Sequence, residues 1–389
     1  MLTDPLVAAI AEAEQLIANA PQARTETERL EGYRYLAGGI LATLHAAWAT
    51  DRSRPGFIQG TGPYTKMGLD NPDTLYFGAR IDGAHSYVVT GRRGSTCDLS
   101  FQVLAGNYTD AEVPGSVTAF DDRAFDIDPD GGFELRFGPE PAGDRRNYIQ
   151  LAPDSTQLLV REVYSDWDQQ RGTVRIDRTD AAGAAPAPLT LEQAQRRFER
   201  AGAGLTSRIR TWLQFPEWFY LKLPVNTMTE PRHTPGGLAT QFSSAGHYDL
   251  TDDQALIITV PAADVPYQGF QLGSVWYTSL NYTDHQTSLN SAQAQVDPDG
   301  KIRIVVSERN PGITNWLETI GHPHGYLQFR WQRVDRELTA ADGPQVELVA
   351  FDDVPSRLPF HERNRISPQD YRARIAARQA GIADRMLTL

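Results

Sequence analysis

The sequence predicts a mainly β protein of the α+β class, with two antiparallel β-sandwich or jelly-roll-like units and helices before, between and after them. Short runs of alternating or apolar residues, such as those at 74–81 and 255–261, are typical of strands, and turn sequences such as Asp-Pro-Asp-Gly-Gly separate them. Helical patterns stand apart from these runs, which favours α+β over a doubly wound sheet. The length of 389 residues fits two domains.

The first 54 residues are expected to form a helical lead-in. Segments 4–20 and 24–49 carry helical patterns, and Thr25 with Glu28 forms a capping-box motif at the start of the second segment. Apolar residues recur in that segment at spacings of three, four and one, which predicts one apolar stripe on a helix. The stripe consists of Leu30, Tyr33, Leu36, Ile40, Leu41, Leu44 and Ala47.

The rest of the chain divides where its composition changes. A loop rich in Gly, Pro and Asn opens the first strand region, and a Pro/Ala-rich stretch at 181–190 is typical of a linker. Ser367 is the expected N-cap of the last helix, with Pro368 at its first position. The expected divisions are an N-terminal β-sandwich domain at 55–180, a linker and helix at 181–239, a C-terminal β-sandwich domain at 240–352 and a C-terminal helix at 353–389.

Charge and cysteine content exclude several classes of function. Lys and Arg number 37 against 49 Asp and Glu, and the formal net charge of −12 opposes binding to nucleic acids and anionic membranes. The one cysteine, Cys97, excludes a disulfide framework and multi-cysteine metal sites. The chain shows no signal-peptide pattern and no long apolar stretch, so we expect a cytoplasmic protein. Exposed sheet edges are compatible with a monomer or a homodimer.

Familiar cofactor and nucleophile motifs are missing from the sequence. There is no Gly-x-Gly-x-x-Gly opening a helix after a strand, no phosphate-binding loop with Gly-Lys-Ser/Thr and no Gly-x-Ser-x-Gly elbow. There is also no His-Glu-x-x-His or calcium-binding loop. We therefore predict a protein without a cofactor, whose partner is a small-molecule substrate.

A polar segment that precedes the first long strand is the first candidate site. Asn71 and Asp73 flank a proline, and Tyr76 lies in the strand that follows. Asx residues beside proline commonly close turns, which is the structural interpretation. The functional interpretation is that Asp73 and Tyr76 face a cleft, where a carboxylate could serve as an acid, a base or a hydroxyl anchor.

Two further strand segments carry polar side chains on one face. Alternation in the strand that contains Arg161 places this arginine on a sheet face, where it could bind an anionic or hydroxyl-bearing ligand or form an internal ion pair. In a later strand, Trp276 lies on an apolar face, while Tyr277 and Asn281 share the opposite face. That face could orient a ligand, or it could be the polar side of an exposed sheet.

The fourth candidate site contains histidines. His322 and His324 follow an Asn-Trp pair, Asn315 and Trp316, and precede the last long strand. His322 is a candidate general acid or base. As an alternative, His285, His322 and His324 could bind a metal ion. They could also simply form hydrogen bonds in loops.

These segments together resemble two families of bacterial proteins, which are catalogued as domains of unknown function 1254 and 1214. The N-terminal part resembles family 1254 through an Asn-x-Asp-Thr-Leu-Tyr element at 71–76. A later Arg-x-x-x-x-Asp-Trp element corresponds to Arg161, Asp166 and Trp167. Both elements lie in the first predicted strand region.

The C-terminal part resembles family 1214 over roughly residues 240–340. The matching elements are an aromatic strand at 271–277, the Asn-Trp-Leu element at 315–317 and Arg330 in the last strand. The usual Phe-Trp-Ser is replaced by Leu-Gly-Ser, which indicates a distinct subfamily. The resemblance implies two β-sandwich units with helical insertions and no settled reaction.

Three functions remain open on the sequence alone. The first is a cofactor-independent enzyme of hydrolase, lyase or isomerase type, which acts by general acid–base chemistry on a hydroxyl-rich, carbohydrate-like, terpenoid or steroid molecule between the two β domains. The second is a non-catalytic binding module anchored by tryptophans, and the third is the histidine metalloenzyme. Candidate catalytic residues are Asp73, Tyr76 and His322, and candidate substrate-binding residues are Asn71, Arg161, Trp276, Tyr277, Asn281, Asn315, Trp316 and Arg330.

Overall fold

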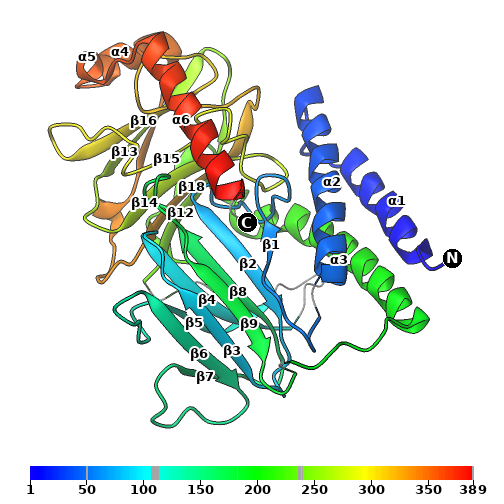
Figure 1. Ribbon diagram of the computed structural model, residues 1–389. Helices are drawn as coiled ribbons and strands as arrows, with labels where there is room; N and C mark the ends of the chain where they lie inside the picture. Colours follow the sequence, from blue (N-terminus) through cyan, green and yellow to red (C-terminus); the bar gives the residue numbers. More distant parts are fainter. Residues whose placement is uncertain (50, 107–113, 182, 235–237, 239, 388–389) are drawn as a thin grey trace.

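A computed structural model shows two β units, with a layer of helices against one side (Figure 1). Parts of the expected divisions lie outside the described residues: residue 50 of the helical lead-in, 107–113 of the N-terminal β-sandwich domain, 182, 235–237 and 239 of the linker and helix, and 388–389 of the C-terminal helix. The structure describes residues 1–49, 51–106, 114–181, 183–234, 238 and 240–387.

The N-terminal unit is a sandwich of two sheets. One sheet has the strand order β1-β2-β8-β4-β5 and the other β7-β6-β3-β9. Alternating apolar residues of both sheets, such as Phe101, Leu135 and Val160, are fully buried in one shared core. The strands are β1 (Ile58–Thr61), β2 (Thr74–Arg80), β3 (Tyr87–Arg92), β4 (Asp98–Ala105), β5 (Gly115–Asp121), β6 (Gly132–Gly138), β7 (Tyr148–Gln150), β8 (Ser155–Val163) and β9 (Thr173–Arg178).

The C-terminal unit repeats this plan. Its sheets have the orders β10-β12-β18-β14-β15, with β11 beside β12, and β17-β16-β13-β19. In both units the smaller sheet carries one short parallel strand, β7 beside β6 and β17 beside β16, and the other pairs are antiparallel. The strands are β10 (Thr227–Met228), β11 (Arg232–His233), β12 (Phe242–Asp249), β13 (Gln254–Pro261), β14 (Tyr267–Gly273), β15 (Ser288–Asn290), β16 (Lys301–Ser307), β17 (Trp316–Glu318), β18 (His324–Gln332) and β19 (Gln345–Ala350).

The predicted fold class is thus confirmed, and so are the capped starts of the second and the last helix. Hydrogen bonds between Thr25 and Glu28 form the expected capping box, and the Ser367 hydroxyl accepts from the third residue of the last helix. No described helix combines the length and the apolar character that crossing a lipid bilayer requires. The helices are α1 (Asp4–Ala18), α2 (Glu26–Ala49), α3 (Leu191–Phe219), α4 (Val354–Arg357), α5 (His361–Asn364) and α6 (Pro368–Leu387).

The buried face of α2 differs from the predicted apolar stripe. Leu30, Tyr33 and Leu41 are 62%, 44% and 55% exposed, so the stripe prediction is wrong for them. The helix instead buries a face that contains glycines. A Cβ atom at Gly32 would clash with the ring of Trp276, so only glycine permits this close approach. Packing of a bulky aromatic side chain therefore decided which face of α2 is buried.

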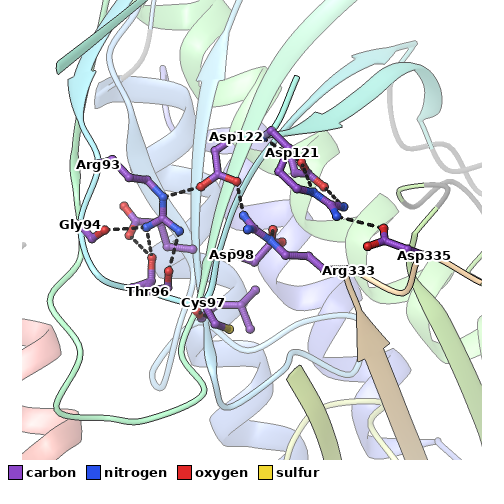
Figure 2. Close-up of polar contacts among 12 residues, drawn as sticks. Arg93, Gly94, Thr96, Cys97, Asp98, Asp121, Asp122, Arg333 and Asp335 are labelled. Carbon is purple, nitrogen blue, oxygen red and sulfur yellow. Dashed lines mark hydrogen bonds and ion pairs between the residues drawn. The ribbon is translucent and has the colours of Figure 1, made fainter. Parts of the chain in front are cut away.

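A network of ion pairs joins the two β units (Figure 2). Arg333, which follows β18, pairs with Asp98 at the start of β4 and with Asp122 after β5. Arg93 also pairs with Asp122 and donates to the hydroxyl of Thr96. The backbone of Arg333 is left-handed, with φ of 59°, which a non-glycine residue rarely adopts without compensating contacts. These pairs hold the C-terminal unit against the N-terminal sheet.

The last helix makes a second connection between the units. Figure 1 shows α6 running from the C-terminal unit toward β1 and β2. Near its start, Tyr371 packs on Trp316 of the C-terminal unit, and near its end Ile382 enters the N-terminal core. The charged residues that α6 brings to this junction surround the first candidate site.

Candidate functional site

The segment 62–73 between β1 and β2 positions the first candidate residues. Gly68 and Leu69 both have positive φ, 66° and 49°, and the amide of Leu69 donates to the carbonyl of Tyr277 over 2.6 Å. The Asn71 side chain accepts from the amide of Asp73 over 3.1 Å, which is the turn-closing role typical of Asx residues. The segment is thereby fixed against the C-terminal unit.

Asp73 lies in a closed polar cluster and is 2% exposed. Its carboxylate accepts from Nε1 of Trp167 over 2.6 Å and from the hydroxyl of Tyr267 over 2.8 Å. The Tyr267 hydroxyl also lies 3.1 Å from Oδ1 of Asn71, and the backbone N–H of Asn71 donates to the hydroxyl of Tyr76. Burial and the charge of Asp73 raise the pKa of Tyr267, so its hydroxyl keeps its proton.

Two arginines of α6 compensate the buried charge of Asp73. Arg378 and Arg385 lie over the ring of Trp167 at 4.7 and 4.5 Å, and Arg385 donates to the carbonyl of Pro72 over 3.1 Å. Burial lowers the pKa of Arg378 to about 10, and the charge of Asp73 opposes that shift. The carboxylate of Asp73 thus connects the N-terminal unit, the C-terminal unit and α6. These contacts account for an aspartate at this position, and no substrate is needed to explain it.

Tyr277 and Trp276, predicted to bind substrate, lie in the interior. Trp276 is fully buried against α2 and donates its Nε1 to the carbonyl of Glu28 over 2.7 Å. Tyr277 is 5% exposed, stacks on Trp212 and hydrogen-bonds the hydroxyl of Tyr220. Both residues therefore dock helices onto the C-terminal unit.

The remaining strand candidates also have partners within the protein. Asn315 exchanges hydrogen bonds with the backbone of Gln295, and Trp316 donates to the carbonyl of Ser307. Arg330 donates to the side chain of Gln271 and to the carbonyl of Leu69, and Arg161 donates to the side chain of Gln102. All four side chains therefore have hydrogen-bond partners inside the protein.

The three histidines have separate partners, so the metal-site alternative is wrong. His285 pairs with Glu318 over 2.8 Å, whereas His324 lies 3.3 Å from Glu28. His322 instead pairs with a glutamate of α2. Among the residues that the structure describes, no three His, Cys, Asp or Glu side chains are grouped so that they could hold a metal ion.

His322 connects the C-terminal unit to a cleft beside α2. Its Nδ1 lies 2.8 Å from the carbonyl of Thr319, and its Nε2 lies 2.7 Å from Oε2 of Glu31. A carbonyl only accepts, so Nδ1 carries a proton. Burial lowers the pKa of His322, but the hydrogen bond to Glu31 and its charge outweigh burial and raise the pKa. His322 is 1% exposed and therefore acts on Glu31 rather than on solvent.

Glu31 lines a small cleft, which we call the Lys66 cleft. It is formed by Glu31 and Arg34 of α2, Lys66 of the segment 62–73, and Ser279 and Asn281 after β14, and its volume is about 50 Å³. One water molecule takes about 30 Å³ of liquid, so this space admits a reacting group of a few atoms and not a whole ligand. Asn281 is the one predicted substrate-binding residue among these five.

Lys66 is the unusual titratable group of the cleft. Its ammonium donates to the carbonyls of Ser279 and Leu280 over 2.8 and 2.6 Å and lies 4.7 Å from the ring centre of Tyr282. Burial lowers the pKa of Lys66 to about 8, and the negative charges of Asp70 and Glu31 partly offset this effect. The ammonium is therefore close to releasing its proton at neutral pH, as a proton-transfer group requires.

The structure does not bring Asp73 and His322 together. Among the described residues they share no hydrogen-bond partner: Asp73 is enclosed by Trp167 and Tyr267, whereas His322 lies behind Glu31. Lys66 and Glu31 were not predicted from the sequence. The available signal was a lysine, a rare residue in this chain, inside a loop of Gly, Pro and Asn.

The fold is similar to that of known structures. A crystal structure of an uncharacterized protein from Burkholderia cenocepacia superimposes with a TM-score of 0.81 and 28% sequence identity, over 90% of this chain and 96% of that chain. The VPA0106 protein from Vibrio parahaemolyticus aligns over 87% of this chain and 99% of its own, with 12% identity and a TM-score of 0.46, too weak a likeness to carry an argument. No family model matches the chain, and no curated protein matches it. The comparisons support the fold and leave the reaction open.

Proposed function

We propose that this protein is a cofactor-independent enzyme of hydrolase, lyase or isomerase type, which performs general acid–base chemistry on a hydroxyl-bearing small molecule at the Lys66 cleft. The observation that carries the proposal is the placement of the ammonium of Lys66 and the carboxylate of Glu31 along one cleft, with a pKa of about 8 for the lysine. An acid and a base of opposite charge at one site are the minimum equipment for proton transfer.

The roles follow from the charges and contacts of the cleft. Glu31 is the base, and His322 orients its carboxylate through the 2.7 Å contact. Lys66 is the acid, because at neutral pH it is protonated and its pKa lies only slightly higher. Asn281 lines the cleft, and its side chain, which also hydrogen-bonds Asp284, orients a substrate hydroxyl. His322 is accordingly a positioning residue in this proposal.

The alternative of a tryptophan-anchored binding module has less support. None of the seven tryptophans, all of which lie in the described residues, is exposed. A flat aromatic platform for sugars would need exposed rings. The buried tryptophans instead form parts of the cores and hydrogen-bond inside the protein, as Trp167, Trp276 and Trp316 do.

The resemblance to the families 1254 and 1214 also remains a proposal. Its support is that residues of its two N-terminal elements meet: Asp73 of the first accepts from Trp167 of the second. Tyr267, which completes the contact, belongs to the C-terminal unit. The cytoplasmic location, the lack of nucleic-acid and membrane partners and the homodimer remain predictions from the sequence.

The first experiment measures the pKa of Lys66 directly. Reductive methylation with ¹³C-formaldehyde labels the lysines, and NMR follows each signal through a pH titration, with Lys66→Arg used to assign the Lys66 signal. A titration near pH 8 is expected, whereas Lys222, which is exposed, supplies the internal control. A Lys66 signal that titrates above pH 10 would remove the basis of the proposal.

The second experiment looks for the substrate class. A thermal-shift screen against sugars, sugar acids, steroids and terpenoids is expected to raise Tm with one class, because a ligand that binds the native state stabilises it. The same compound should be turned over by wild-type protein and by Lys222→Met, but not by Lys66→Met or Glu31→Gln. Activity should fall as pH rises through about 8, where Lys66 loses its proton. Unchanged turnover by Lys66→Met would refute the assignment.

A further inference from the structure

A second, larger cleft lies away from the Lys66 cleft and shares no lining residue with it. It is bounded by the residues that follow α2, by the first turns of α3 and by the paired ends of β2 and β8. Its volume is about 640 Å³, which is in the range of ligand-binding pockets, roughly 300–1,000 Å³. The size alone sets it apart from the Lys66 cleft.

Arginine dominates the lining of this cleft, which we call the arginine cleft. Five guanidinium groups face it, whereas Asp51 supplies the one carboxylate among the described lining residues. The chain as a whole has a net charge of −12, so the local excess of positive charge opposes the general trend of the protein. The five residues are Arg52, Arg80, Arg196, Arg197 and Arg200.

Three of the five arginines have partners within the protein. Arg197 donates to the carbonyl of Trp48 and pairs with Asp51 over 3.3 Å. Arg196 pairs with a glutamate one turn earlier on α3, and Arg52 lies 3.8 Å from Asp82. These contacts fix the walls of the cleft but leave its net charge positive.

Arg80 and Arg200 differ from the other three. Within the part of the chain that the structure describes, neither guanidinium group has a hydrogen bond or an ion pair. Burial lowers the pKa of Arg80 to about 10, and the positive charges of Arg200 and Arg52 add to this effect. Burial and the charges of Arg52 and Arg197 likewise lower the pKa of Arg200. The two groups repel each other in a partly dehydrated space, which an anion would relieve.

We propose that the arginine cleft binds a small molecule with two or more oxyanion groups, phosphate or carboxylate. Guanidinium groups match both groups through paired N–H donors. No aromatic side chain is among the described lining residues, so nothing there would stack on a base, which disfavours a nucleotide. The site is independent of the proposed acid–base function.

The test is isothermal titration calorimetry with pyrophosphate and with citrate, each compared with sodium chloride at matched ionic strength. Binding of at least one of the two is expected. If only pyrophosphate binds, the ligand carries phosphate groups. If only citrate binds, the ligand carries carboxylate groups. If both bind, the site selects its ligand by negative charge. Heat no greater than that of the chloride control for both compounds would overturn the proposal.

Variants locate the binding. Arg80→Gln and Arg200→Gln should each raise the Kd about tenfold or more, because each removes one charge-assisted contact with the ligand. The matched control is Arg336→Gln, which removes one exposed arginine of the C-terminal unit and should leave binding unchanged. Without ligand, the Tm of Arg80→Gln should be close to or above that of wild type, which separates lost binding from unfolding. Equal affinities of Arg80→Gln, Arg200→Gln and the control would refute the site.

Discussion

At the contact between the two β units, Arg93 and Arg333 meet Asp98 and Asp122. The arginine cleft, in contrast, is lined by five guanidinium groups, and Asp51 is the one carboxylate among its described lining residues. The first region is balanced in charge, and its side chains are 1–15% exposed. The second has an excess of positive charge around a cleft of about 640 Å³. Arginine thus stabilises the fold where carboxylates pair with it. Arg80 and Arg200 have no such partner among the described residues and are therefore available to bind a ligand.

The largest expected effect comes from removing the central arginine of the balanced region. Arg333→Ala leaves the carboxylate of Asp98 buried without its arginine partner and removes one of the two arginines that pair with Asp122. We expect a loss of about 3–5 kcal/mol in the free energy of unfolding, measured with urea. The control Arg336→Ala removes an exposed pair and should cost less than about 1 kcal/mol. Equal losses would show that the network adds nothing.

The Asp73 cluster provides the second comparison. Tyr267→Phe removes a hydrogen bond to a buried carboxylate, and we expect a loss of about 1.5–3 kcal/mol in the free energy of unfolding. Tyr33→Phe is the control, because Tyr33 is 44% exposed on α2. A loss below about 0.5 kcal/mol for Tyr267→Phe would mean that the cluster is not closed to water.

The third prediction concerns pH and Asp98. Burial raises the pKa of Asp98 to about 6, although Arg333 lowers it. A carboxyl group whose pKa is higher in the folded state binds its proton more tightly there, so its contribution to stability rises as pH falls from about 6 toward 4. The stability of wild type minus that of Asp98→Asn should thus be about 1–2 kcal/mol larger at pH 4.5 than at pH 7. A difference that is unchanged or smaller at pH 4.5 would show that Arg333 keeps Asp98 ionised.

The smallest effect is expected in the arginine cleft. Arg80→Gln removes a guanidinium group that has no protein partner among the described residues, so the free energy of unfolding without ligand should stay within about 0.5 kcal/mol of wild type or rise. Urea unfolding in buffer without phosphate or citrate measures this. A loss above about 2 kcal/mol would indicate an internal role and would remove the contrast with Arg333.

Several residues that the sequence predicted as site residues have other roles in the structure. Asn71 and Asp73 were predicted because they flank a proline. In the structure, Asn71 closes a turn, and Asp73 links the two units through Tyr267. His322 was marked by its chemistry, and it supports Glu31. Lys66 was distinguished only as a rare lysine in a loop of Gly, Pro and Asn. Arg80 had no distinguishing local sequence, because its environment comes from distant segments. Arg196, Arg197 and Arg200 were a visible signal, since they lie within two turns of one helix.

The sequence by itself determined the α+β class, the order of helices and strand regions and the capping of α2 and α6, because these depend on side chains a few residues apart. Only the tertiary structure decided which face of α2 is buried, where Gly32 meets Trp276. It also decided that Arg333 finds two carboxylates while Arg80 finds none within the described residues. Burial and pairing of charge depend on what segments hundreds of residues apart bring together, and that information is not contained in local spacing.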